Sequence, residues 1–347
     1  MEDTNYGQIN IIYDSYEKQK SAYEKMSFKD SLRLIIISGI IGFCMIAFKY
    51  LGDVLASWIT NSVLIDYYFD SIVIYNATQI FFSMFTIVLP FTIGNFLIKR
   101  ITPSYRISYH LPKTKSLLFA ALAISFLTLI ISNFVTSFFI LAAESVGFEF
   151  EIYPFEAAKN VPDFLWQFLA TAITPALVEE FAMRGVVLQS LRKYGDSFAI
   201  IVSAVIFALM HGNMVQTPFA LILGIVIGWF VVITDSLWTG IAIHLMNNTY
   251  ALVVTTMGEY LSDGWYLVIA AVINVVGSLL GLAAIIWLIA TRRHDIKLYE
   301  PGGNTSKVQA KYRVSAFICT IISIPMFAAL IIMIKEVIGT VSFVGIN

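Results

Sequence analysis

The sequence predicts an all-α fold, a polytopic transmembrane helical bundle with eight or nine spans. Of its 347 residues, 58% are hydrophobic and only 13% are charged, against about 25% charged residues in soluble domains. Mean hydropathy is +0.79, and the apolar residues form runs of the length that a bilayer requires. This composition excludes a soluble globular protein, a disordered chain and a nucleic-acid binder. The net charge of −1 gives no field that would attract a polyanion.

The spans follow from the apolar runs, because a helix needs about 20 apolar residues to cross the hydrocarbon core. The segments at 197–213 and 217–235 are closely coupled, so the count is eight or nine. The expected spans are 33–51, 77–98, 116–143, 164–192, 197–213, 217–235, 237–256, 264–290 and 314–335.

The ends of the spans predict the topology. Residues 1–30 are polar, and we expect a cytoplasmic N-terminal segment with no removable signal peptide, followed by a single bundle at 31–347. The connections 99–115 and 291–313 are basic, whereas those on the other side of the spans are acidic. The N-terminus and the basic loops should therefore face the cytoplasm of the cell membrane. The use of Ile, Lys and Asn favours a bacterial source.

Charged side chains within a span cost about 2.5–3.5 kcal/mol each on insertion scales, so Glu179, Glu180 and Arg184 are informative. Glu180 and Arg184 are spaced i, i+4 and can pair. Glu179 points about 100° away, so its carboxylate must face a polar cavity, bind a cation or take a proton. The alternative is a charge network that only holds helices together. Pro175 should kink this helix and free the Thr171 carbonyl.

Two later spans carry the other unexpected polar groups. Phe207 and His211 are spaced i, i+4, and His244 is followed by Asn247 and Asn248 near the same helix face. The alternatives are a histidine satisfied within the core and hydrogen bonding between helices alone.

A helical rise of 1.5 Å per residue places Glu179 and His211 both about 21 Å from their shared cytoplasmic turn. The same arithmetic places His244 only about 10 Å from its own turn. Tilt or unequal turn depths would have to absorb this mismatch.

A carboxylate, two imidazoles and an amide in a cavity suit the activation of water beside a scissile carbonyl. Glu179 would be the general base, and a histidine would bind a metal or orient the water directly. Signatures of other hydrolases are missing: there is no His-Glu-x-x-His, no Gly-x-Ser-x-Gly and no Gly-x-Gly-Asp. A Gly-rich phosphate loop is also missing, which leaves ATP-driven transport unsupported.

Three motifs in order, Glu179-Glu180-x-x-x-Arg184, Phe207-x-x-x-His211 and His244-x-x-x-Asn248, resemble the signature of the CPBP family of intramembrane endopeptidases. That family comprises the CAAX prenyl proteases and the bacteriocin-processing, Abi-like membrane proteins. The resemblance covers about residues 164–256 and implies a helical bundle with protease activity. It implies that Glu179 activates water with His211 as its partner, and that His244 and Asn248 bind the oxyanion. The supporting residues would be Glu180, Arg184, Phe207 and Asn247.

The resemblance leaves the cofactor open. Glu179, His211 and His244 would complete a zinc site with water, as in a metalloprotease, and a metal-free route is comparably consistent with the sequence. The substrate would be a membrane-associated peptide or protein, such as a peptide precursor, a bacteriocin or pheromone leader, or an isoprenylated tail. The surrounding bilayer is the only other expected partner, and the sequence does not give the oligomeric state.

Two other functions fit the same residues. One is a non-enzymatic membrane scaffold or bacteriocin-immunity protein of the same fold. The other is an ion-coupled transporter with Glu179 as the ion site, which the lack of inverted repeats disfavours.

Overall fold

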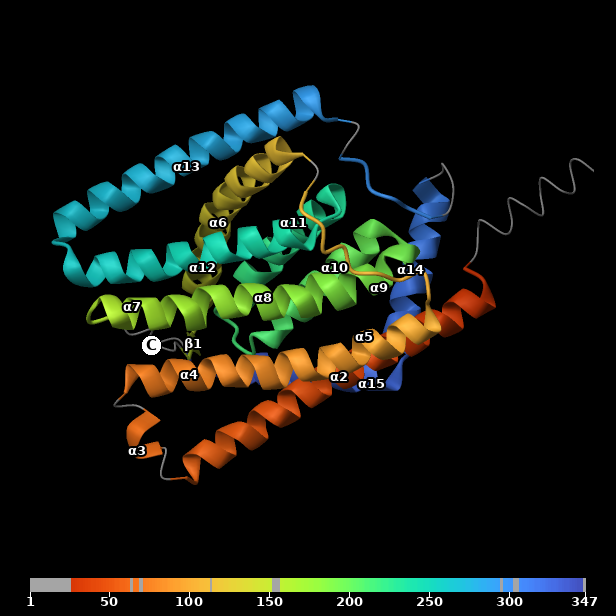
Figure 1. Ribbon diagram of the computed structural model, residues 1–347, viewed down its shortest axis with the longest axis horizontal. Helices are drawn as coiled ribbons and strands as arrows, with labels where there is room; N and C mark the ends of the chain where they lie inside the picture. Colours follow the sequence, from red (N-terminus) through yellow and green to blue (C-terminus); the bar gives the residue numbers. More distant parts are fainter. Residues whose placement is uncertain are drawn as a thin grey trace, which may run out of the picture.

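Long helices run side by side through the computed structural model and form one elongated bundle (Figure 1). The structure describes residues 26–62, 65–68, 71–112, 114–151, 157–293, 296–301 and 306–345. Most of the expected N-terminal segment, residues 1–25, lies outside the described residues. The helices are α2 (Phe28–Thr60), α3 (Ile65–Tyr68), α4 (Ile72–Ser83), α5 (Leu89–Ile101), α6 (Lys115–Glu144), α7 (Val161–Gln167), α8 (Thr174–Glu180), α9 (Gln189–Leu191), α10 (Asp196–Met210), α11 (Thr217–Thr234), α12 (Leu237–Tyr260), α13 (Asp263–Thr291), α14 (Ser306–Ile321) and α15 (Ile324–Gly339).

By length and composition, the described residues contain six helices that could cross a membrane, or seven if one bent pair counts as a span. The sequence predicted eight or nine, and each of those nine segments is largely helical. The difference comes from α10 and α12. With 15 residues, α10 is about 22 Å long, shorter than a bilayer core. Although α12 is long enough, its polar side chains lower its hydropathy.

The expected last span, 314–335, is broken. Helices α14 and α15 meet at an angle of 81°. Pro325 lies in the first turn of α15, and proline has no amide hydrogen with which to continue a helix from the preceding turn. The segment is therefore a bent pair instead of one straight helix.

A small sheet, which the sequence analysis did not predict, joins the segment after α6 to the segment after α15. Strands β1 (Phe148–Phe150) and β2 (Val341–Phe343) pair antiparallel, with Glu149 opposite Ser342. Glu151 extends the pairing by donating its amide hydrogen to the carbonyl of Thr340 (3.0 Å).

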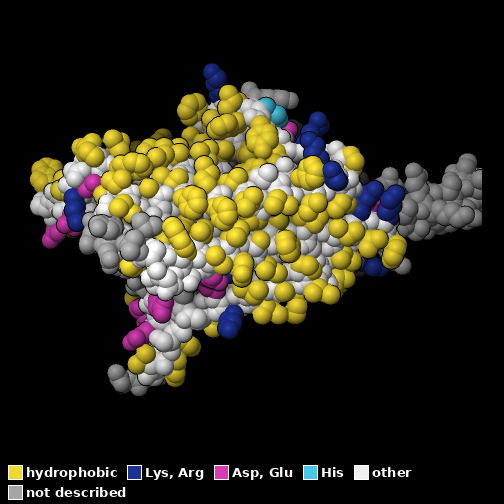
Figure 2. Space-filling model, turned by 60° about the horizontal axis from the view of Figure 1, so that its bottom comes forward, with side chains coloured by type: hydrophobic (Ala, Val, Ile, Leu, Met, Phe, Trp, Pro, Cys, Tyr) yellow, Lys and Arg dark blue, Asp and Glu magenta, His cyan; other side chains and the backbone are white. Residues whose placement is uncertain are grey.

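The basic connections between helices lie together at one end of the bundle. The Asp196 amide donates to the carbonyl of Tyr299 (2.8 Å), and the Leu237 amide donates to that of Ser108 (2.9 Å). The loop after α5, the turn before α10, the turn before α12 and the segment after α13 thus lie at one end. Figure 2 shows hydrophobic side chains over most of the visible body, with the visible Lys and Arg mainly towards the right-hand end of the view.

Candidate active site

The helix that carries both glutamates is continuous from Val161 to Tyr194 but changes its winding twice. Wider π-helical turns at Phe168–Ile173 and Phe181–Leu188 flank the α-helical stretch α8. Pro175 follows the first π-helical turn. Since proline cannot donate to the carbonyl one turn earlier, the wider winding accommodates its ring. Short π-helical segments often occur at functional sites, and here they place Glu179 and Glu180 between two of them.

Glu180 and Arg184 form a fully buried ion pair, as the i, i+4 spacing predicted. The Arg184 guanidinium donates to Glu180 Oε1 (2.7 Å), and both side chains are 0% exposed. It also donates to the carbonyl of Gly224 in α11 (3.2 Å) and stacks on the Phe207 ring in α10 at 4.4 Å. One arginine therefore joins three helices around the carboxylate of Glu180.

His244 lies between the two glutamates. Its Nδ1 is 3.0 Å from Glu180 Oε1, and its Nε2 is 4.0 Å from Glu179 Oε2. Because Glu180 is already paired with a cation and accepts hydrogen bonds, Nδ1 carries a hydrogen atom. Nε2 is then the nitrogen that faces Glu179. The sequence alone left His244 too shallow, but the structure brings it into contact with Glu180.

Glu179 differs from its neighbour in exposure. Its side chain is 23% exposed, whereas that of Glu180 is fully buried. The 4.0 Å gap to His244 is too long for a hydrogen bond, and one water molecule could bridge such a gap. Glu179 therefore combines access to water with a nearby imidazole.

His211 ends α10 instead of lying within a span. It is the first residue after the helix, and Gly212 follows with φ +62°, a left-handed conformation that favours glycine. The ring Nδ1 donates to the carbonyl of Phe207 (2.8 Å), which leaves Nε2 free to accept. The sequence had placed His211 inside a segment that reached residue 213.

Phe207 connects the second and third motifs. Its ring contacts the ring of His211 edge-to-face at 4.8 Å and that of His244 at 5.7 Å between centroids. Arg184 covers the same ring. One side chain from each of the three motifs therefore lies against the buried Phe207 ring: Arg184, His211 and His244.

Asn247 and Asn248 form a hydrogen-bonded chain on α12. Asn247 Nδ2 donates to Asn248 Oδ1 (3.0 Å), and Asn248 Nδ2 donates to the carbonyl of Thr171 (3.0 Å). This is the carbonyl that Pro175 was expected to free. The amide of Asn248 is thereby fixed against the π-helical turn before α8, with one N–H remaining available.

Two glycines that the sequence analysis did not assign to the site shape it. A Cβ atom on Gly240 would lie 2.7 Å from Glu180 Oε2 and 2.8 Å from Val231 Cγ2. Gly240 lies one turn before His244, and only this spacing could have indicated it. Gly224 supplies the carbonyl that accepts from Arg184.

The residues expected to bind zinc do not form a ligand cluster. In the part of the chain that the structure describes, no three His, Cys, Asp or Glu side chains come together closely enough to hold a metal ion. Glu179, His211 and His244 all belong to that part. Among the described residues, Nε2 of neither histidine makes a protein hydrogen bond, and Nδ1 is engaged elsewhere.

A comparison with protein families adds a separate observation. Residues 161–250 match the family described as Rce1-like, type II CAAX prenyl endopeptidase. This chain carries an Rce1-like domain. The domain spans roughly a quarter of the sequence, from α7 into α12, and contains every residue of the three motifs. The family resemblance seen in the sequence is confirmed for this domain. No curated protein and no solved structure gives a significant match to the chain.

Proposed function

We propose that this multi-pass membrane protein is an intramembrane endopeptidase that hydrolyses a peptide bond in a membrane-associated peptide or protein. The observation that carries the proposal is the placement of His244 between a buried, paired Glu180 and a partly exposed Glu179. The Rce1-like domain supports the same reaction class, since its family is described as an endopeptidase.

In the proposed mechanism, Glu179 acts as the general base. A water molecule held between Glu179 and His244 attacks the carbonyl carbon, and its proton passes to the Glu179 carboxylate. The carbon–nitrogen bond of the tetrahedral intermediate then breaks, and the same proton passes to the leaving amine. The products are a carboxylic acid, which keeps the second proton of the water molecule, and a free amine, and Glu179 is regenerated.

Glu180 acts through His244. Its carboxylate accepts the Nδ1 hydrogen of His244, which sets the orientation of the ring and directs Nε2 towards Glu179. Arg184 keeps the Glu180 carboxylate in place. We assign the second N–H of Asn248 to the developing oxyanion, since its first N–H is anchored on Thr171. No step in this mechanism needs a metal ion.

The proposed topology places the N-terminus and the end of the bundle that holds Ser108, Asp196 and Tyr299 on the cytoplasmic side. Basic residues of 99–115 and 291–313 belong to this end, as positive-inside topology requires. Residues 31–347 would form a single bundle around the Rce1-like domain.

The test is cleavage by the full chain reconstituted in liposomes, followed by mass spectrometry of the products. Two probes separate the substrate classes: a peptide with an isoprenylated C-terminal CAAX sequence, and an unmodified membrane-anchored leader peptide. Glu179→Gln should reduce the cleavage rate by about 10²–10⁴. The control is Glu259→Gln, which removes a carboxylate of α12 that lies outside the three motifs. If Glu179→Gln cleaves as fast as the parent, the proposal is wrong.

A further inference from the structure

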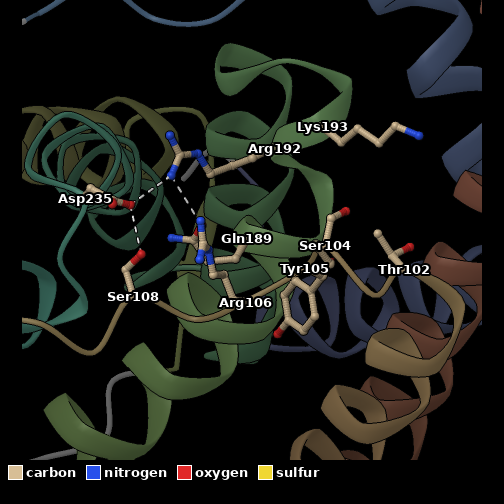
Figure 3. A pocket seen from close by; sticks show the side chains of 10 residues that line it. Thr102, Ser104, Tyr105, Arg106, Ser108, Gln189, Arg192, Lys193 and Asp235 are labelled. Atoms are coloured by element: carbon tan, nitrogen blue, oxygen red, sulfur yellow. Dashed lines mark hydrogen bonds and ion pairs between the residues drawn. The ribbon is translucent and has the colours of Figure 1, made fainter.

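A polar hollow of about 280 Å³ lies at the basic end of the bundle, away from the three motifs (Figure 3). It is walled by the loop after α5, by the last turns of the Val161–Tyr194 helix and by Asp235 in the turn before α12. The loop is anchored there, because the Tyr105 hydroxyl donates to the carbonyl of Gly185 (3.2 Å). None of the motif residues lines this hollow.

The hollow has an excess of positive charge. Arg106, Arg192 and Lys193 line it, against the single carboxylate of Asp235. Arg192 is engaged by Asp196 at 2.9 Å and by Asp235 at 3.4 Å.

The other two cations, Lys193 and Arg106, differ in whether an acidic side chain pairs with them. Lys193 is paired with Asp30 (2.5 Å). Within the described part of the chain, no ion pair or hydrogen bond engages the exposed Arg106. The hollow therefore presents one guanidinium whose charge is not neutralised.

Hydroxyl-bearing side chains also line the hollow. The exposed Ser104 and the half-buried Ser108 are among them. A guanidinium presents N–H groups that match the oxygen atoms of a phosphate group, and hydroxyls can add further hydrogen bonds to it. The C-terminal ends of α5 and α11 oppose an anion through their dipoles, and Lys99 and Arg100 in the last turn of α5 offset part of this effect.

An apolar groove leads away from this end along the lipid-facing side. It has a volume of about 350 Å³, runs between α2 and α5, and its lining includes Ile36 and Leu97. Leu97 lies on α5, and Thr102 of the hollow follows it by five residues, directly after the end of that helix. On α2, Asp30, which pairs with Lys193 of the hollow, precedes Ile36 by six residues. The groove between α2 and α5 therefore extends towards the hollow.

We propose that the hollow and the groove together form a binding site for an anionic phospholipid. The phosphate contacts Arg106 and the hydroxyls, and an acyl chain lies between α2 and α5. Basic pockets between transmembrane helices bind such headgroups. A zwitterionic headgroup would bring a second cation next to Arg106 and Lys193, so the site selects for net negative charge. This site is independent of the proposed cleavage reaction.

The experiment measures lipid binding to the purified full chain in neutral detergent by native mass spectrometry. The probes are phosphatidylglycerol, phosphatidylcholine with the same acyl chains, glycerol 3-phosphate and inorganic phosphate. Phosphatidylglycerol should bind most tightly, and Arg106→Gln should weaken it roughly fivefold to tenfold. Arg293→Gln is the matched control, since Arg293 is an exposed cation of the basic connection 291–313 and does not line the hollow. Arg106→Lys, which keeps the charge, should keep the preference for phosphatidylglycerol.

Three results would overturn the proposal. Equal binding of phosphatidylglycerol and phosphatidylcholine would remove the selection for charge. Equal losses in Arg106→Gln and Arg293→Gln would show a diffuse surface field instead of a site. Binding of inorganic phosphate or glycerol 3-phosphate as tight as that of the lipid would show that the groove holds no chain.

Discussion

Glu180 and His244 are 64 residues apart in the chain, yet Oε1 of one lies 3.0 Å from Nδ1 of the other. The same Glu180 oxygen also accepts from Arg184. The second carboxylate oxygen, Oε2, has no hydrogen-bond partner among the described residues and lies against Gly240. Glu180 is thus the buried centre of the site, while Glu179 beside it is open to water. The first two predictions test this division.

Glu180→Gln should destabilise the protein much more than Glu179→Gln. Removing the Glu180 charge leaves Arg184 buried without its counter-ion, which costs about 3–5 kcal/mol in buried pairs. Glu179 is partly exposed and, among the described residues, its nearest ionic partner is His244 at 4.0 Å, so its change to Gln should leave the free energy of unfolding nearly unchanged. Denaturant unfolding in mixed micelles measures both. The double change Glu180→Gln with Arg184→Met should recover much of the loss, and equal stabilities of the two single variants would contradict the assignment.

Gly240→Ala should displace the Glu180 carboxylate. The added methyl would lie 2.7 Å from Oε2 and 2.8 Å from a Val231 methyl, and such overpacking typically costs about 1–3 kcal/mol. Gly258→Ala is the matched control on the same helix, because the nearest atom to its Cβ would be 3.7 Å away. That control should be neutral or stabilising, since alanine favours a helix over glycine by about 1 kcal/mol. Similar unfolding free energies for the two variants would show that the contact at Gly240 is not tight.

The sequence predicted the local relationships of the site and missed those that depend on how helices face one another. The Glu180–Arg184 pair follows from spacing along one helix, and the free Thr171 carbonyl follows from Pro175. The depth of His244 did not follow from counting residues, because tilt and turn depth are properties of the assembled bundle. Only its spacing one turn before His244 could have indicated Gly240, because its contact with Glu180 exists only when α12 lies against that residue.

The break in the last span had a signal that the sequence analysis did not use. Ser323 and Pro325 interrupt the apolar run at 314–335, and the helices meet there at 81°. Counting apolar residues measures length alone, whereas a proline in the first turn marks the start of a new helix.

Asn248→Ala should lower the rate of cleavage more than the binding of substrate. Removing one donor to an oxyanion typically costs about 10²–10³ in rate, and the Thr171 carbonyl would also lose its partner. Steady-state kinetics in liposomes should show a fall in kcat with KM little changed. Thr249→Ala, the adjacent residue whose hydroxyl only bonds back to Leu245, is the control. A change confined to KM would assign Asn248 to substrate binding.

Purified protein should contain much less than one zinc ion per chain. As the side chains lie, Glu179, His211 and His244 do not form a three-ligand group, and structural or catalytic zinc sites need three or four protein ligands at about 2 Å. Elemental analysis of the parent beside a His211→Ala, His244→Ala double variant measures the metal directly, without a substrate. Chelation should leave any cleavage activity unchanged. Stoichiometric zinc in the parent that disappears in the double variant would show that these side chains rearrange around a metal, and would replace the metal-free mechanism.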